Sequence, residues 1–74
     1  MTAKLRPAGA LKKYIDDREE VEIESGRTIR QVLSELGIPA EIVALVVVNE
    51  EQKSKDYTLE DNDVVRILAV IGGG

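Results

Sequence analysis

The stretch SGRTIRQVLSELGIP, residues 25–39, carries the strongest local structural signal in this chain. Thr28 and Gln31 have the spacing of a capping box, in which each side chain bonds the other residue's backbone N–H at the start of a helix. One helix face then follows at the i, i+3, i+4 and i+7 positions, formed by Ile29, Val32, Leu33 and Leu36. Gly37 suits the left-handed residue that ends a helix, and Pro39 prevents continuation. The pattern predicts a helix from Ile29 to Leu36 with one apolar face to bury.

The segments before this helix predict two strands that form a hairpin. We expect an irregular first strand from Ala3 to Leu11, because its proline cannot donate to a sheet and its glycine suggests a bend. Lys12 to Glu19 follow as a polar turn or a short helical turn. Val21 and Ile23 then alternate with glutamates, which predicts a half-buried second strand.

The segments after the helix predict two further strands. A short helical turn is expected over Ala40 to Ile42. Ala44 to Val48 are continuously apolar, which favours a strand buried on both faces in the middle of a sheet. A polar connection follows, with room for one short extra strand near Tyr57, and Val64 to Ile71 read as the last strand.

This order of elements predicts a two-layer α+β domain, because one helix covers only one face of a sheet. The order suits a β-grasp, in which the first and last strands lie side by side at the centre. We expect a mixed sheet of four or five strands with one main helix packed on one face. We expect residues 1–71 to form this single domain and residues 72–74 to form a flexible glycine tail.

The last strand should present two different faces, since side chains alternate along a strand. Val65, Ile67 and Ala69 are expected to meet the helix. The open face then carries Arg66, Leu68 and Val70. An exposed apolar patch there is a usual mark of a partner-binding surface. The alternative is that a loop or the N-terminal hairpin covers it.

The composition excludes several classes of function. The 74 residues include no cysteine and no histidine, which excludes disulfides, thiolate metal sites, a cysteine nucleophile and a serine triad. The net charge of −4, with scattered basic residues, argues against nucleic-acid binding. No apolar stretch approaches the roughly 20 residues of a membrane span, and no signal peptide is recognisable, so the cytoplasm is the expected compartment.

Two acidic groups are better explained by local structure than by chemistry. The acidic residues between Asp16 and Glu20 match no calcium-loop pattern and read as a solvated turn. Asp61 and Asp63 flank Asn62 in a segment typical of turns, so turn formation is favoured over a paired-carboxylate site. No metal site is expected.

The chain ends RILAVIGGG, residues 66–74, and this ending allows two interpretations. The glycines are either slack or a lead that presents the C-terminal carboxylate of Gly74. Glycine has no Cβ and adopts almost any backbone conformation, so such a tail can enter a channel that side chains would block. With no histidine or cysteine available, the terminus is the most plausible reactive group.

Taken in order, four pieces resemble the ubiquitin-like sulfur carriers of the MoaD/ThiS family, which includes the small subunit of molybdopterin synthase and the thiamine sulfur carrier. They are GRTIRQVLSELGIP, ALVVVN, EDNDVVRI and the terminal GGG. The resemblance spans about Lys4 to Gly74. Its most specific part is the Gly73–Gly74 terminus at the end of a β-grasp pattern.

The resemblance implies a protein cosubstrate that is not an enzyme by itself. A partner activating enzyme would adenylate Gly74 with ATP and Mg²⁺, and sulfur from a sulfurtransferase would replace AMP to give a thiocarboxylate. The tail of Gly72, Gly73 and Gly74 would then enter an acceptor synthase. Leu68 matches an apolar position that faces the partner in molybdopterin-synthase-like relatives. No bound cofactor is implied for the carrier itself.

Departures from the family pattern leave the pathway open between molybdopterin and thiamine. Asn62 stands where the family usually has glycine, although asparagine tolerates positive φ. Three other functions also stay open. The chain could be a ubiquitin-like modifier joined to proteins through Gly74, a β-grasp binding domain with an incidental glycine end, or a regulatory domain that binds a small ligand.

Overall fold

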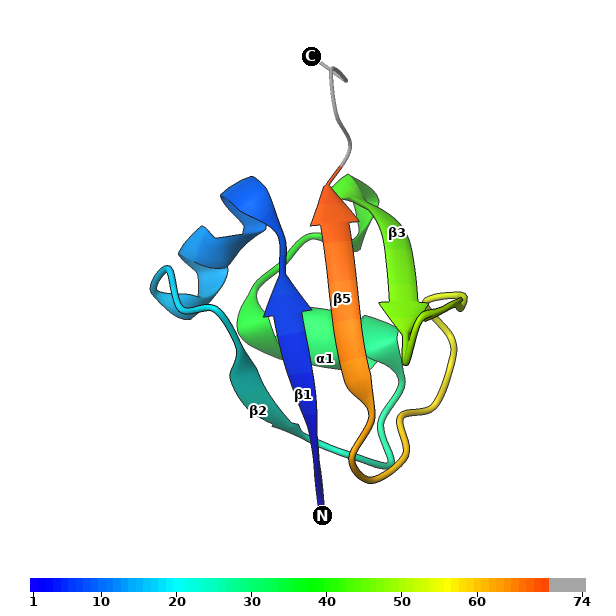
Figure 1. Cartoon of the computed structure of the whole chain (residues 1–74). Helices are drawn as coiled ribbons and strands as arrows, with labels where there is room; N and C mark the ends of the chain where they lie inside the picture. Colours follow the sequence, from blue (N-terminus) through cyan, green and yellow to red (C-terminus); the bar gives the residue numbers. More distant parts are fainter. Residues whose placement is uncertain (70–74) are drawn as a thin grey trace.

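The computed structural model describes residues 1–69, and residues 70–74 lie outside that description. The described chain forms a five-stranded sheet, one α-helix and two 3-10 helices (Figure 1). The strands are β1 (Thr2–Pro7), β2 (Val21–Glu24), β3 (Val43–Val48), β4 (Glu51–Gln52) and β5 (Val64–Ala69). The helices are η1 (Gly9–Ile15), α1 (Ile29–Leu36) and η2 (Ala40–Ile42).

The sheet has the strand order β2-β1-β5-β3-β4, with the first and last strands side by side at its centre. β1 and β5 run parallel, and the other neighbouring pairs are antiparallel. Figure 1 shows β5 between β1 and β3, with α1 crossing one face of the sheet. The α+β class, the β-grasp order and the N-terminal hairpin of β1 and β2 are therefore confirmed.

Helix α1 begins and ends where its sequence predicts. The Thr28 hydroxyl accepts from the Gln31 N–H at 3.1 Å, and the Gln31 side-chain oxygen accepts from the Thr28 N–H at 2.9 Å. At the other end, Gly37 takes φ 77°, and the Ile38 N–H donates to the Leu33 carbonyl at 2.9 Å. These bonds satisfy backbone groups that a helix end leaves unpaired, so the predicted bounds of Ile29 and Leu36 are confirmed.

The core lies between α1 and the face of the sheet that it covers. Val65 and Ile67 of β5 are completely buried there, and Ala69 is half-buried. From the helix, Ile29 and Leu33 are also buried against the sheet. The predicted inner face of the last strand is confirmed.

The first strand is shorter than predicted. β1 ends at Pro7, and the Ala8 N–H donates to the Ile67 carbonyl at 3.0 Å. Gly9, at φ 55°, then turns the chain into η1, which buries Leu11 and Ile15. The prediction of a strand running to Leu11 is wrong, because these apolar side chains reach the core from a helical turn.

The prediction that the third strand is buried on both faces is also wrong. Val43, Val46 and Val48 are buried, whereas Leu45 and Val47 are only half-buried and Ala44 is exposed. The continuous apolar run arises because the open face carries apolar side chains of its own. The short extra strand is β4, Glu51–Gln52, which pairs with the end of β3 and lies five residues before Tyr57 in the sequence. Next to Tyr57 the structure has an isolated bridge between Thr58 and Thr28 and no strand.

Among the helices of residues 1–69, none combines the length and apolar character that a membrane span needs.

Candidate functional site

The candidate site is the open face of the sheet along β5, on the side opposite α1. β5 pairs with β1 on one side and with β3 on the other, so it forms the middle of this face. Arg66 is exposed and Leu68 is half-buried, as their alternation with the buried Val65 and Ile67 predicts. The other predicted site residues, Val70, Gly72, Gly73 and Gly74, lie outside the described residues. The roles of all six remain predictions.

Apolar side chains from β3 extend the open face beside β5. Leu45 is the register partner of Leu68, and both are half-buried. Val47 is the register partner of Arg66. Cross-strand pairs of this kind place side chains within contact distance on one face. Leu45 and Val47 were not predicted as site residues, because the continuous apolar run of β3 predicts a strand with both faces covered.

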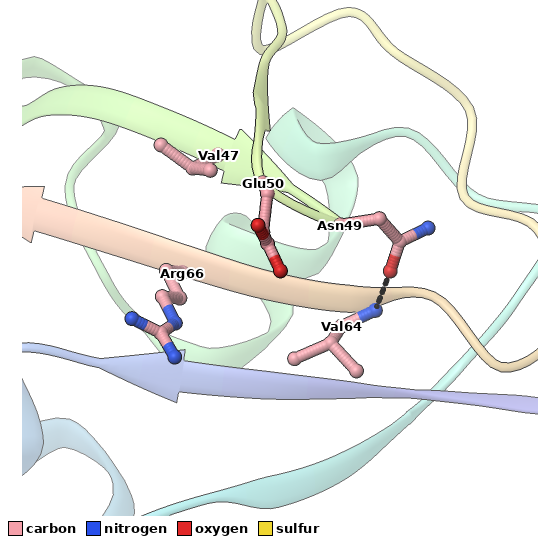
Figure 2. A pocket seen from close by; sticks show the side chains of 5 residues that line it. All are labelled: Val47, Asn49, Glu50, Val64 and Arg66. Carbon is pink, nitrogen blue, oxygen red and sulfur yellow. Dashed lines mark hydrogen bonds between the residues drawn. The ribbon is translucent and has the colours of Figure 1, made fainter.

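An open hollow of about 510 Å³ lies on this face beside β5, lined by Val47, Asn49, Glu50, Val64 and Arg66. Figure 2 shows Val47 on β3, Glu50 on the turn that follows it, and Val64 and Arg66 on β5. The hollow therefore combines an apolar floor with one carboxylate and one guanidinium.

The wall of this hollow depends on a tight turn after β3. Asn49 and Glu50 take φ values of 50° and 73°, in the left-handed region that few side chains adopt. The Asn49 side-chain oxygen accepts from the Val64 N–H at 3.0 Å, the bond drawn in Figure 2. This contact joins the turn to the first residue of β5. From the sequence, residues 49–57 are predicted only as a polar connection.

The buried carboxylate of Asp63 stabilises the same turn through hydrogen bonds. The residue is 4% exposed and accepts from Asn49 Nδ2 at 2.7 Å, from the Tyr57 hydroxyl at 3.1 Å and from the Glu60 N–H at 2.9 Å. Burial and then the hydrogen bond with Asp63 raise the pKa of the Tyr57 hydroxyl. Asp63 therefore acts in turn formation, as expected, and Asn62 beside it takes the positive φ of 70° that the sequence allowed.

The acidic segment after η1 shows no sign of a cation site. Asp16 and Asp17 take left-handed φ values of 58° and 61°, as residues of a tight turn do. Glu19 lies 3.0 Å from the Lys12 ammonium, and Glu20 contacts Lys4 and Arg6. Within residues 1–69, no three acidic side chains gather in a way that would hold a metal ion.

The sequence of this chain matches a known protein family. A profile described as the ThiS family matches residues 8–74, which is most of the chain. The chain belongs to the ThiS family. The match includes the Gly73–Gly74 terminus and the whole of β3 and β5.

Two curated relatives come from Thermus thermophilus. The chain is 35% identical over 60 residues to the sulfur carrier protein TtuB, covering 81% of this chain and 91% of the relative. It is 40% identical over 53 residues to the sulfur carrier protein ThiS, covering 66% of this chain and 81% of the relative. Both relatives are named for the same role.

Solved structures confirm the ubiquitin-like β-grasp fold. A putative molybdopterin converting factor subunit 1 from Pyrococcus furiosus has a TM-score of 0.70 at 20% identity, covering 96% of this chain and 99% of that one. A chain in the complex of subunits 1 and 2 of the molybdopterin-converting factor from Helicobacter pylori has a TM-score of 0.66 at 24% identity, with both chains fully covered. At these identities the likeness shows the fold alone.

Proposed function

We propose that this ThiS-family chain is a sulfur carrier, a protein cosubstrate whose Gly74 carboxylate becomes a thiocarboxylate. The thiocarboxylate donates its sulfur in cofactor biosynthesis, to molybdopterin or to the thiazole of thiamine. The observation that carries the proposal is the family match over residues 8–74, which includes the terminal glycines. The names of the two curated relatives, both sulfur carrier proteins, support it.

The chemistry proceeds in two displacements on Gly74, both inside a partner activating enzyme. In the first, a carboxylate oxygen attacks the α-phosphorus of ATP, with Mg²⁺ on the phosphates, and pyrophosphate leaves. In the second, a thiol reductant releases hydrosulfide from the persulfide of a sulfurtransferase, the hydrosulfide attacks the acyl carbon, and AMP leaves. The carrier supplies only the carboxylate, which agrees with a sequence that contains neither histidine nor cysteine.

The fold supports this chemistry by fixing the direction of the last strand. β5 is bonded to β1 on one side and to β3 on the other. Ala69 is therefore the end of a central strand, five residues before Gly74. Gly72 and Gly73 carry no side chain, so they add little width to whatever channel admits the terminus.

The open face of β5 is the surface we assign to protein partners. Arg66 and Leu68 lie on it, and Val70 continues the same alternation in the sequence. The partners are the activating enzyme and an acceptor synthase. The Helicobacter pylori relative, which is titled as a complex of two subunits of the molybdopterin-converting factor, supports the second of these.

Intact-mass spectrometry tests the proposal directly. The protein is incubated with ATP, a sulfide source and its activating enzyme, and the expected product is heavier than the free acid by the difference between sulfur and oxygen. A variant with one residue added after Gly74 should gain no mass, whereas a control with one residue added before Met1 should react normally. Unaltered mass of the wild-type protein under these conditions would overturn the proposal.

The same experiment separates a carrier from a protein modifier. A carrier accumulates as thiocarboxylate and returns to the free acid when an acceptor synthase is added. A modifier instead forms an amide with lysines of other proteins, which appears as higher-mass species after proteolysis. Conjugates without sulfur transfer would replace the carrier assignment. Rescue of molybdopterin-deficient or thiazole-deficient bacterial strains then identifies the pathway.

A further inference from the structure

Two arginines lie side by side on the open face. Arg6 and Arg66 are register partners in the parallel pair of β1 and β5. Their chain neighbours Leu5, Val65 and Ile67 are buried in the core, so both guanidinium groups belong to the opposite face. Neighbouring strands are about 4.8 Å apart, and like charges directly opposite each other destabilise a sheet. The two guanidinium groups therefore repel each other, and an anion bound between them would remove this repulsion.

Acidic groups of the chain itself offset this repulsion only in part. Glu20 lies 3.8 Å from Arg6 and 3.5 Å from Lys4, so one carboxylate serves two cations. These side chains are between 41% and 56% exposed, and ion pairs in water contribute little. Among residues 1–69, no carboxylate lies within ion-pair distance of Arg66. Arg66 therefore presents its donors outward.

Arg66 also separates two hollows of different chemistry. On the β3 side is the hollow of about 510 Å³, floored by Val47 and Val64. On the β1 side is a second hollow of about 300 Å³, which Arg66 shares with Arg6, Lys12 and Glu19 among others. Glu19 is engaged with Lys12 at 3.0 Å and Glu20 with Arg6 at 3.8 Å. Of the cations that line this hollow, Arg66 is therefore the one with no carboxylate partner among residues 1–69. An apolar group fits the Val47 and Val64 floor of the first hollow, which Glu50 also lines, and an anionic group fits the second hollow beside Arg66.

We propose that this face binds a protein segment that carries an acidic residue beside an apolar one. The carboxylate binds between Arg6 and Arg66, and the apolar side chain packs on Val47 and Val64. Identifying the bearer of this segment as the activating enzyme rests on the proposed function. Guanidinium groups favour carboxylates because their paired N–H donors match the two oxygens. The open face of β5 would thus recognise two kinds of partner side chain, a carboxylate and an apolar group.

Charge complementarity selects a protein over a nucleic acid as the occupant. The chain has a net charge of −4, Glu20 contacts Arg6, and Glu22 of the edge strand β2 lies opposite Lys4. A nucleic-acid site needs a broad basic surface that neutralises several phosphates. Two arginines beside an apolar floor instead match one carboxylate and one apolar side chain. Because the whole chain is acidic, the attraction between the arginines and a partner carboxylate acts only at short distance.

A nuclear magnetic resonance titration with two synthetic peptides of equal length tests the surface without any enzyme. One peptide alternates leucine with glutamate, and the other alternates leucine with lysine. The acidic peptide should shift the backbone amides of residues 4–6, 45–48 and 64–68, and the basic peptide should not. Equal binding of both peptides, no binding of the acidic one, or tighter binding of a single-stranded oligonucleotide to the same amides would overturn the proposal.

Matched charge reversals sharpen this titration. Arg66→Glu should weaken binding of the acidic peptide about tenfold, which corresponds to about 1.4 kcal/mol. Arg66→Gln should weaken it less, because it removes the charge without reversing it. Arg30→Glu makes the same charge change on α1, across the sheet, and should leave binding unchanged. An equal loss in Arg30→Glu and Arg66→Glu would reduce the effect to net charge and sink the assignment.

A kinetic experiment separates this inference from the proposed function. Pyrophosphate exchange by the activating enzyme is measured with increasing carrier, and Arg66→Glu should raise the KM for the carrier about tenfold at unchanged kcat. If wild-type carrier supports no exchange, the proposed function fails, although the peptide titration still decides the surface. If Arg66→Glu and wild type have the same KM, the inference fails and the proposed function stands.

Discussion

The two faces of β5 differ in nearly every physical property, although they alternate residue by residue. Val65 and Ile67 are completely buried against α1, whereas Arg66 is exposed and Leu68 is half-buried on the open side. One face excludes water, and the other meets it. The strand therefore separates two requirements within six residues, stability on the inner face and recognition on the outer face.

The contrast between the two faces predicts which property each substitution should change. A change on the inner face should alter the free energy of unfolding and leave recognition intact in the molecules that still fold. A change on the outer face should do the reverse. Asp63, with its partners Asn49 and Tyr57, lies where the two requirements meet, because it supports both the start of β5 and the wall of the hollow.

The largest effect should come from Ile67→Ala on the inner face. Ile67 is completely buried, and removing three buried carbons leaves a cavity that costs about 2–5 kcal/mol. Urea unfolding followed by circular dichroism measures the loss. Residual folded protein should still bind the acidic peptide as tightly as wild type. A loss below 1 kcal/mol by the same measurement would contradict tight packing of this face.

The next effect should come from Asp63→Asn, which has nearly the same shape. Asp63 accepts three hydrogen bonds from donors, and an amide would place its own N–H₂ against at least one of them. A buried donor left without a partner costs about 1–3 kcal/mol. Asp61→Asn is the matched control, because Asp61 is exposed in the same turn. Equal losses in the two variants would contradict the role given to Asp63.

Local parts of the fold could be predicted from the sequence, and parts that depend on distant contacts could not. Helix α1 was predicted with both ends correct because Thr28, Gln31 and Gly37 act within one or two turns of chain. The burial of β3 was predicted wrongly, because an apolar run reads the same whether a second layer or an apolar open face lies against it. The short helical turn predicted as one option over Lys12 to Glu19 is η1, but it begins earlier, at Gly9, and ends at Ile15, because Leu11 and Ile15 reach the core from it.

The candidate site divides in the same way. Arg66 and Leu68 were placed on the open face by simple alternation along one strand. Val47, Asn49 and Glu50 were missed, because only the antiparallel pairing of β3 with β5 brings them beside those residues. Arg6 was missed for the same reason, since its position beside Arg66 depends on the register of a parallel pair distant in sequence.

A smaller effect on stability, with a larger effect on function, should come from Leu68→Ala on the outer face. Leu68 is half-buried, so its truncation should cost about 1 kcal/mol of unfolding free energy. It should nevertheless raise the KM for the carrier in pyrophosphate exchange several-fold, because it removes apolar surface from the partner contact. Val32→Ala on α1 is the control, because it also removes apolar carbons but takes them from the buried layer on the other side of the sheet. If the KM rises in proportion to the loss of unfolding free energy in both Leu68→Ala and Val32→Ala, the two faces do not differ in recognition.

The smallest effect should come from Tyr57→Phe and should appear only in alkaline solution. Burial and the hydrogen bond with Asp63 raise the pKa of the Tyr57 hydroxyl above its ordinary 10.0, so the folded state holds this proton more tightly than the unfolded state. The resulting stability is fully present below the unfolded pKa and is lost as pH rises through the folded one. Wild type should therefore lose stability more steeply than Tyr57→Phe above about pH 10. Urea unfolding across that range measures the slopes, with Tyr14→Phe as the control because its hydroxyl bonds no side chain within residues 1–69. If the unfolding free energy falls with pH equally steeply in wild type and Tyr57→Phe, the Tyr57–Asp63 hydrogen bond does not contribute to stability as argued.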